Sequence, residues 1–411
     1  MTTHTYEKGF RLLLLNIAQG LGTFIQILDT SIANVAIPYI AGNLSVSSDE
    51  GTWVITSFAV SQAIMLPLTG WLARRFGEVR LFLWSTALFT VASILCGLSQ
   101  NLSMLVFFRV LQGAVSGPMI PLSQSILLAN YPPEKRGLAT GIWAMTAVVA
   151  PIFGPIMGGI ITDNYTWPWI FYINVPVGIF SVIFTMITLS GRETGTAKLP
   201  IDYIGLILLT VGIGALQILL DKGHDLDWFH SDAIRILGIL ALISLSFLVV
   251  WLLTQADPII DLYLFADRTY TIGVICLTLG FFVYFSNVVI FPLWLQTQMG
   301  YTPTWAGLAA APVGIIPFIL TPFVGIYMSR FDLRLIVSAG FVVFVVTSYW
   351  QSNFYTQVGF IELIEPRFVQ GIGLAFFFTP LIAIVLANIP HAKMASALGV
   401  ANFFRILGGS F

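Results

Sequence analysis

Charge is the scarcest property of this chain. Asp, Glu, Lys and Arg make up 9% of its 411 residues, whereas hydrophobic residues make up 57%. A water-soluble domain normally carries about 25% charged residues, because its surface must be hydrated. The composition therefore excludes a soluble domain of this size and predicts an all-α polytopic membrane protein embedded in a lipid bilayer.

Cysteine and the common catalytic arrangements are also scarce or missing. The two cysteines, Cys96 and Cys276, lie inside apolar runs and provide no disulfide framework. The sequence has no phosphate-binding Gly-x-x-x-x-Gly-Lys loop and no Ser/His/Asp or Cys/His arrangement, so neither an ATP-driven motor nor an enzyme is expected. A net charge of −1 without a basic tail argues against nucleic acid as a partner. We expect no cofactor.

One polar stretch, 221–232, combines His and Asp residues at spacings that a metal ion could use. It contains no cysteine and no regular pattern of ligands. We therefore interpret this stretch as a solvated loop and predict no metal site.

Twelve apolar runs are long enough to cross a bilayer, which takes roughly 20 mostly apolar residues. The first ends near Pro38 and is too long for the core of a cleaved signal peptide. A thirteenth run starts near Ala395 and is still apolar at Phe411, so we expect this helix to be cut there. The twelve runs begin near Leu12, Trp53, Leu81, Leu102, Leu138, Trp169, Tyr203, Ala233, Thr271, Trp305, Leu333 and Glu362.

Basic residues alternate from one connection to the next. Of the 18 Lys and Arg residues, thirteen fall in alternate connections, two fall in the others and three lie inside apolar runs. Short cytoplasmic loops hold an excess of Lys and Arg. The pattern therefore predicts a cytoplasmic N-terminus.

Part of the first half of the chain recurs in the second half. Residues 130–141 align with 388–399 at an offset of 258, and residues 70–76 align with 325–331 at an offset of 255. The offset of 258 also pairs Arg109 with Arg367 and Gln112 with Gln370. The chain therefore contains two related halves, and parallel repeats of this kind place a substrate cavity between them.

The repeat predicts the domain organisation. We expect an N-terminal six-helix bundle at 1–190, a linker with two inserted helices at 191–255, and an incomplete C-terminal bundle at 256–411. Two six-helix bundles and two inserted helices require fourteen helices, of which the sequence holds twelve complete ones and part of a thirteenth.

The run from Gly141 to Gly159 combines residues that bend a helix with residues that allow close packing. Each proline removes a backbone donor and clashes with the preceding turn, so the helix should bend there. Glycines let another helix approach closely. This pattern is typical of a moving part, although a static kinked packing helix has the same signature. The residues concerned are Pro151, Gly154, Pro155, Gly158 and Gly159.

Two ionisable residues lie at similar depth inside apolar runs of the first half. Asp29 lies about eight residues before the end of the first run and Arg109 about seven residues into the fourth. Because charge in hydrocarbon is costly, an ionisable residue there is a functional hypothesis. We expect the two side chains to pair or to share a cavity. A static structural pair, or Arg109 reaching to the interface, remains an alternative. Arg367 is the repeat equivalent of Arg109. The acids Glu362 and Glu365 near it are expected to lie at the membrane–water interface.

Several segments resemble the motifs of major facilitator transporters. Residues 70–80 resemble the loop between their helices 2 and 3, residues 109–113 resemble their helix 4 motif, and residues 154–159 resemble the helix 5 signature of their antiporters. Residues 28–38 are similar to the helix 1 motif of the fourteen-helix drug:proton antiporters. With the two inserted helices, the resemblance is to the EmrB/QacA family and covers the whole chain.

This resemblance implies proton-driven export of hydrophobic drugs from the cytoplasm or inner leaflet by alternating access. It assigns proton coupling to Asp29 and Arg109, and pivoting to the helix 5 glycines and prolines. It also implies a bacterial inner membrane, a periplasmic adaptor and an outer-membrane channel. The substrate cavity is expected to include Asn34, Gln112, Arg367 and Gln370. The cytoplasmic gate is expected to include Gly70, Arg74, Arg75, Gly77 and Arg80.

One departure from the family pattern limits this transfer, and the substrate stays open. Arg74 stands where the facilitator loop motif usually has Asp, so the charge latch proposed for that acid does not carry over. The same scaffold could export an endogenous metabolite such as a siderophore, fatty acid or amino acid. A non-transporting membrane receptor is a third interpretation. Asp29 favours cationic substrates, whereas Arg109 and Arg367 favour anionic ones.

Overall fold

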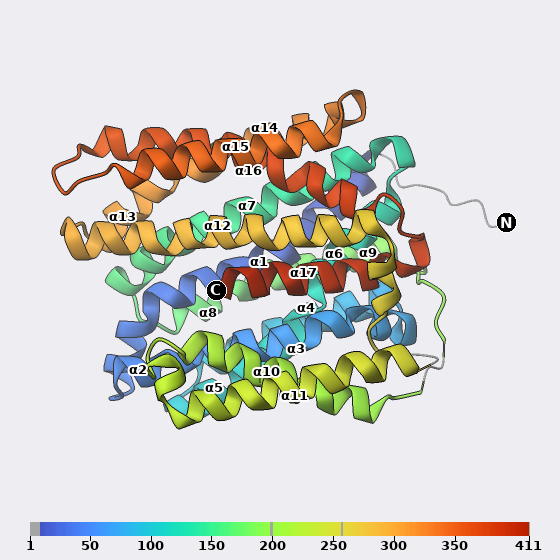
Figure 1. The fold of residues 1–411 in the computed structure, drawn as a ribbon, viewed down its shortest axis with the longest axis horizontal. Helices are drawn as coiled ribbons and strands as arrows, with labels where there is room; N and C mark the ends of the chain where they lie inside the picture. The colour runs from blue at the N-terminus through green and yellow to red at the C-terminus, as the bar shows by residue number, and fades with distance from the viewer. Residues whose placement is uncertain (1–8, 198–199, 256–257, 411) are drawn as a thin grey trace.

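The computed structural model describes residues 9–197, 200–255 and 258–410, and in these ranges all regular structure is helical. Figure 1 shows most of the long helices lying side by side along the horizontal axis. The α-helices are α1 (Gly9–Asn43), α2 (Ser48–Gly51), α3 (Trp53–Phe76), α4 (Glu78–Gly97), α5 (Leu102–Ser116), α6 (Met119–Asn130), α7 (Arg136–Asn164), α8 (Trp169–Tyr172), α9 (Asn174–Leu189), α10 (Tyr203–Lys222), α11 (Asp232–Thr254), α12 (Arg268–Gln298), α13 (Pro303–Ala310), α14 (Pro312–Tyr327), α15 (Leu333–Ser352), α16 (Phe360–Leu386) and α17 (Met394–Ser410). Short 3₁₀ helices occur at Pro133–Lys135, Trp228–His230, Leu262–Ala266, Met328–Arg330 and His391–Lys393.

Twelve helical segments of the described chain are long and apolar enough to cross a membrane, which confirms the predicted spans. α17 is shorter and corresponds to the thirteenth run. Two spans are interrupted next to a proline that cannot donate a backbone hydrogen bond. α5 gives way to α6 at Gly117 and Pro118, and α13 gives way to α14 at Pro312. α1 also continues through Pro38 to Asn43, past its predicted end.

Equivalent helices make the same contacts in the two halves. In the first half α1 packs against α7, α3 against α5, and α4 against α5. In the second half α12 packs against α17, α14 against α16, and α15 against α16. These pairs correspond to one another under the offsets found in the sequence. The stretch predicted to be inserted forms α10 and α11, which pack against each other. α10 also contacts α3, at the lower edge of Figure 1.

Two close seams join the halves, α7 against α14 and α3 against α17. A Cβ on Gly141 would lie 2.5 Å from the carbonyl oxygen of Thr321 in the first seam. A Cβ on Gly399 would lie 2.7 Å from the carbonyl oxygen of Leu66 in the second. Gly399 follows Gly141 by 258 residues and Thr321 follows Leu66 by 255, so the two seams are related by the internal repeat.

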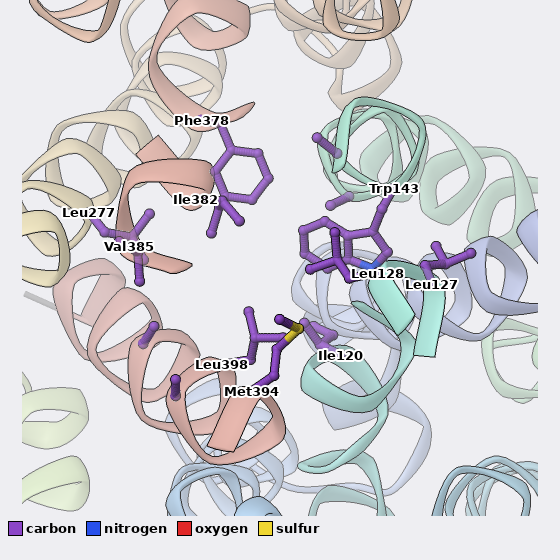
Figure 2. Packing of buried hydrophobic residues seen from close by; sticks show 14 of the residues in the cluster. Ile120, Leu127, Leu128, Trp143, Leu277, Phe378, Ile382, Val385, Met394 and Leu398 are labelled. Carbon is purple, nitrogen blue, oxygen red and sulfur yellow. The ribbon is translucent and has the colours of Figure 1, made fainter. Parts of the chain in front are cut away.

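An apolar seal lies between the halves and extends these seams. The rings of Trp143 on α7 and Phe378 on α16 lie 5.9 Å apart, and both side chains are buried. Figure 2 shows these two rings on facing helices, with Ile120 close to Met394 and Leu398 of α17. The indole N–H of Trp143 is not left unpaired, because Ser123 Oγ accepts it at 2.9 Å.

The seal lies toward one membrane face, which we call the basic face. This face is defined by the connections that carry Arg74, Arg80, Lys135, Arg330 and Lys393. Leu127 and Leu128 belong to the same apolar cluster as Trp143 and Phe378, and together with Met394 they lie within eight residues of Lys135 or Lys393 along the chain. The molecule is therefore closed between its halves at the basic face.

Candidate functional site

A buried ion pair joins α1 and α5. Arg109 Nη1 lies 2.5 Å from Asp29 Oδ2, and the two side chains are 0% and 1% exposed. Arg109 Nε also donates a 2.9 Å hydrogen bond to the carbonyl oxygen of Val54, and the guanidinium lies 4.2 Å from the ring centroid of Phe58. The structure thus brings together the two residues that the sequence placed at similar depth, although Asp29 lies further from the end of α1 than expected.

Three amide and hydroxyl side chains complete this cluster. Asp29 Oδ1 accepts hydrogen bonds from Gln112 Nε2 at 3.1 Å and from Asn174 Nδ2 at 2.7 Å. Gln112 also accepts from Arg109 at 2.7 Å and donates to Ser93 Oγ at 2.8 Å. The Asp29 carboxylate on α1 is therefore held by side chains of α5 and α9, and Ser93 of α4 accepts hydrogen bonds from two of them, Gln112 and Asn174. We call these five residues the Asp29 cluster: Asp29, Ser93, Arg109, Gln112 and Asn174.

The sequence of α5 explains how this geometry is reached. Arg109 and Gln112 are three residues apart and therefore share one helix face. Gly113 follows on the same side, and a Cβ there would collide with the carbonyl oxygen of Phe58 on α3. Glycine at this position lets α5 approach α3 closely enough for Arg109 to reach Val54.

The energetics of the pair depend on both partners being present. A single charge in the centre of a bilayer costs roughly 2.5 to 3.5 kcal/mol on insertion scales. A buried pair adds little net stability, but removal of one partner leaves an uncompensated charge and is strongly destabilising. The two opposite charges of the Asp29 cluster cancel, so a substitution that removes either charge leaves the other uncompensated and should destabilise the protein.

The equivalent position in the second half has no carboxylate beside the arginine. Arg367 Nη1 donates to Gln370 Oε1 at 3.0 Å, as Arg109 does to Gln112. Its guanidinium lies 3.5 Å from the ring centroid of Phe291. Arg367 forms no ion pair with any described residue. Glu362 and Glu365 are exposed, and their position at the membrane interface stays a prediction.

A second buried arginine of the second half, Arg405, lies on α17. Its Nε donates to Asn402 Oδ1 at 3.0 Å, and its guanidinium lies 5.0 Å from the ring centroid of Phe281. The ring of Phe281 also lies 5.9 Å from that of Tyr284, whose buried hydroxyl forms no hydrogen bond with the described residues. Sequence reasoning counted three basic residues inside apolar runs but did not select Arg405. It also missed Ser93 and Asn174, which carry no charge and give no signal of their own.

The four predicted cavity residues do not form one site. Gln112 belongs to the Asp29 cluster, and Arg367 and Gln370 are buried together in the second half. Asn34 is exposed on α1. The predicted cavity set therefore falls into three separate environments in this closed molecule.

The predicted hinge residues lie on α7, which is one continuous helix from Arg136 to Asn164. A Cβ on Gly154 would collide with Ser31 of α1, and a Cβ on Gly158 would lie 3.3 Å from the carbonyl oxygen of Ile32. Gly159 is less crowded, because a Cβ there would lie 3.6 Å from Thr304 Oγ1 of α13. Pro151 is buried. The side chain of Pro155 lies outside the described residues.

The predicted gate residues surround the link between α3 and α4 on the basic face. A Cβ on Gly70 would collide with Ser396 of α17, so this residue lies in the seam between the halves. Arg74 is exposed, Arg75 stacks at 5.3 Å on Trp71, and Arg80 pairs with Glu193 at 3.8 Å. Gly77 has a φ of +91° and also lies against Glu193.

Glu193 ties the segment after α9 to the start of α4. Its carboxylate accepts hydrogen bonds from the backbone N–H groups of Val79 at 3.1 Å and Arg80 at 2.9 Å. A carboxylate at this position is favourable because the first N–H groups of a helix have no intrahelical partner. Glu193, rather than an acid at position 74, therefore organises this turn.

The polar stretch 221–232 is the connection between α10 and α11, and residues 224–230 are exposed. Lys222 pairs with Asp225 at 3.2 Å. Within the described part of the chain, no group of three or more His, Cys, Asp or Glu side chains is arranged to hold a metal ion.

The chain matches the family model of the Major Facilitator Superfamily over residues 20–411. It is 53% identical to the multidrug export protein EmrB of Escherichia coli (strain K12), over 98% of this chain and 79% of that protein. It is 52% identical to the fatty acid resistance protein FarB of Neisseria gonorrhoeae, with the same shares covered. Among solved structures, the proton:xylose symporter XylE matches with a TM-score of 0.67 at 17% identity, covering 97% of this chain and 86% of that one.

The fold, the twelve spans and these similarities agree with the motifs read from the sequence. They support an EmrB-like drug transporter and not an enzyme. The chain belongs to the Major Facilitator Superfamily.

Proposed function

We propose that this chain exports hydrophobic, drug-like compounds from the cytoplasm or the inner leaflet in exchange for protons. The observation that carries the proposal is the Asp29 cluster, a buried carboxylate paired with Arg109 in a helix long and apolar enough to cross the membrane. The similarity to proteins named for multidrug export supports the choice of cargo. No bound nucleotide or metal is needed in this scheme, because the proton gradient supplies the energy.

The Asp29 cluster offers a physical link between proton binding and conformational change. Protonation of Asp29 removes the negative charge that compensates Arg109, and a lone buried cation is costly. Proton uptake therefore favours a rearrangement in which Arg109 gains water or another acceptor. Proton release restores the ion pair.

Alternating access would occur at the two seams between the halves. The positive-inside pattern favours a cytoplasmic basic face and N-terminus. In that orientation, the closed molecule corresponds to a state sealed toward the cytoplasm. Gly70 in the α3–α17 seam belongs to the gate, together with Arg74, Arg75, Gly77 and Arg80 in the adjoining turn. Pro151, Gly154, Pro155, Gly158 and Gly159 on α7 would allow the halves to pivot.

The resemblance to the EmrB/QacA family also supports a tripartite arrangement. We propose an inner-membrane location, with a periplasmic adaptor and an outer-membrane channel as partners. Co-purification of these partners with the full-length protein from membranes tests this part independently of transport.

Export of an amphipathic acid is a second candidate for the cargo. The relative FarB is named for fatty acid resistance and is 52% identical to this chain. This candidate changes the substrate and leaves the proton-coupled mechanism unchanged.

Proton flux in liposomes tests the function directly. Full-length protein is reconstituted with a trapped pH-sensitive dye, and a hydrophobic weak acid or a lipophilic cation is added. We expect substrate-dependent proton movement that falls at least tenfold in Asp29→Asn. Asp232→Asn, which changes an exposed acid on α11, is the matched control and should leave flux unchanged.

Either of two results would contradict the proposal. One is the absence of substrate-dependent flux with both compounds from folded protein. The other is undiminished coupled flux in folded Asp29→Asn.

A further inference from the structure

Polar side chains form a continuous stripe along α1. Asn16, Gln19, Thr23, Gln26 and Asp29 follow one another at spacings of three, four, three and three residues, so each lies beside the next on the helix surface. The last four are buried, although α1 is long and apolar enough to cross a membrane. Buried polar groups in such a helix are costly unless they are hydrogen-bonded or hydrated. We call these five residues the α1 stripe.

The α1 stripe leads from the buried carboxylate to the basic face. At its far end, Asn16 Nδ2 donates a 2.8 Å hydrogen bond to the hydroxyl of Tyr131. Tyr131 caps the end of α6 and directly precedes the connection that carries Lys135. At 1.5 Å per residue, the stretch from Asn16 to Asp29 spans about 20 Å of the helix. The stripe therefore joins Asp29 to the face that the apolar seal closes.

Several atoms along this line have no protein partner. The amide oxygens of Asn16, Gln19 and Gln26 are buried and form no hydrogen bond with the described residues. Next to the carboxylate, Arg109 Nη2 and Asn174 Oδ1 are also buried and unpaired within the described chain. Buried polar groups without a protein partner are commonly satisfied by ordered water. A contact that served only to hold helices together would pair these atoms with protein, so their arrangement favours water along the stripe.

Trp143 of the apolar seal binds the stripe near its middle. Its indole N–H donates to Thr23 Oγ1 at 3.1 Å and to Ser123 Oγ at 2.9 Å, and these two hydroxyl oxygens lie 2.7 Å apart. All three side chains are buried. An indole N–H can only donate, so it occupies hydroxyl oxygens that would otherwise accept a hydrogen bond from water. In the closed molecule Trp143 therefore interrupts the stripe between its two ends.

We propose that the α1 stripe is a hydrated path for proton release from Asp29 to the basic face, and that the indole N–H of Trp143 closes this path at Thr23. The inference rests on the proton-coupled exchange proposed above and adds its route. When the halves separate at the basic face, Trp143 leaves Thr23 and water takes its place. The Asp29 carboxyl group then gives its proton to the nearest water. Each water accepts one proton and passes on another, and the carboxylate pairs again with Arg109.

Proton leak without substrate tests the role of the indole N–H. Full-length protein is reconstituted in liposomes with a trapped pH-sensitive dye, and a pH gradient is imposed. Trp143→Phe keeps an aromatic ring in the seal but removes the N–H, so we expect a severalfold faster leak than with the unaltered protein. The leak should disappear when Asp29→Asn is added. Trp167→Phe is the matched control and should not leak, because the Trp167 N–H donates to Asn43 at the other end of α1.

Substitutions within the stripe test the route. Gln26 and Gln19 lie on either side of Thr23 along α1. Gln19→Leu and Gln26→Leu replace an amide by an apolar side chain of similar size. Each, combined with Trp143→Phe, should return the leak to the level of the unaltered protein. Gln19→Asn in the same background keeps an amide and should preserve the leak, which separates loss of the route from a loss of folding.

Three results would overturn the proposal. The first is the absence of a leak in folded Trp143→Phe. The second is an equal leak in Phe378→Leu, which loosens the seal but keeps the indole N–H, because the leak would then follow the packing of the seal. The third is a leak that persists in both glutamine-to-leucine variants, because the protons would then take another route.

Substrate-driven flux separates failure of the path from failure of the exporter function. If a hydrophobic weak acid or a lipophilic cation drives Asp29-dependent flux but Trp143→Phe does not leak, the path is wrong and export stands. If Trp143→Phe leaks through the stripe but neither compound drives flux in the unaltered protein, the path stands and proton-coupled export is wrong.

Discussion

The two halves of this transporter use the same helix motif in opposite electrostatic settings. Arg109 and Arg367 are repeat equivalents, and each donates to a glutamine three residues later. Arg109 forms an ion pair with Asp29, whereas Arg367 forms no ion pair with a described residue. The two halves therefore share the contact between an arginine and a glutamine three residues later and differ in whether a described carboxylate compensates the arginine.

The comparison also changes how the charges in the sequence are interpreted. Asp29 and Arg109 had suggested opposite substrates, but they pair with each other. Neither charge of this pair therefore indicates by itself the charge of a substrate.

The largest expected effect is on stability, and it comes from a substitution that makes the first half resemble the second. Asp29→Asn leaves Arg109 buried without a counter-charge, which should cost about 3 to 5 kcal/mol of stability. The double variant Asp29→Asn with Arg109→Gln removes both charges and should recover most of this loss. Thermal unfolding in detergent measures both. A double variant no more stable than the single one would contradict the interpretation of the cluster as a neutral pair.

The second-largest effect, on access to the basic face, is expected from substitutions in the two seams between the halves. A Cβ on Gly141 would lie 2.5 Å from the backbone of Thr321, and this backbone atom can move only together with its helix. Gly141→Val should therefore separate α7 from α14 and open the basic face. Cysteine labelling at position 143 should rise severalfold in a variant carrying Trp143→Cys and Gly141→Val.

The repeat makes Gly399 the matched test of this idea, because its Cβ would meet the backbone of Leu66 in the other seam. Gly399→Val should increase the same labelling. Gly195→Val, at a glycine with open space around its Cβ position, is the control. Unchanged labelling in both seam variants would show that the glycines do not hold the basic face closed.

A smaller effect is expected when the second half is made to resemble the first. Tyr284 occupies the repeat position of Asp29 at the offset of 255, and its buried hydroxyl forms no hydrogen bond with the described residues. Tyr284→Asp should give Arg367 the carboxylate partner that Asp29 gives Arg109, and this should raise the melting temperature by a few degrees. Tyr284→Phe removes only the hydroxyl and serves as the control. An unchanged or lower melting temperature in Tyr284→Asp would contradict this interpretation of the repeat.

The smallest effect concerns an exposed contact at the start of α12. Hydrogen bonds from the backbone N–H of Tyr270 and from the Asn388 side chain hold the pKa of Asp267 below its usual value. A carboxyl group with a lowered pKa in the folded state stabilises the protein at neutral pH, and this contribution is lost as the pH falls through that pKa. Asp267→Asn should lower the melting temperature by a degree or two at pH 7 and by less at pH 3, where part of this contribution is already lost. An equal decrease at both values would exclude the charge as its cause.

Features that recur along the chain or appear in its composition could be predicted, because each follows from a constraint that the bilayer places on the backbone or on charged side chains. A bilayer-spanning segment must satisfy its own backbone hydrogen bonds, so a long apolar run specifies a helix wherever it occurs. The spans, the repeat and the family followed from such runs and from the motifs at 70–80, 109–113 and 154–159. The approach of Asp29 to Arg109 followed from depth alone, since two opposite charges inside hydrocarbon have few other partners.

The remaining features depended on packing between helices that are far apart in the sequence. Asn174 became a hydrogen-bond donor to Asp29, and Ser93 an acceptor for Gln112 and Asn174, only because α9 and α4 pack where α1 and α5 meet. Neutral polar residues give no signal of that position in the sequence. Phe291 came to lie against Arg367 only through the packing of α12 against α16. The sequence by itself determined which residues lie in the membrane and which halves are related. The tertiary structure decided which buried charges are compensated, because compensation depends on distances of a few ångströms between different helices.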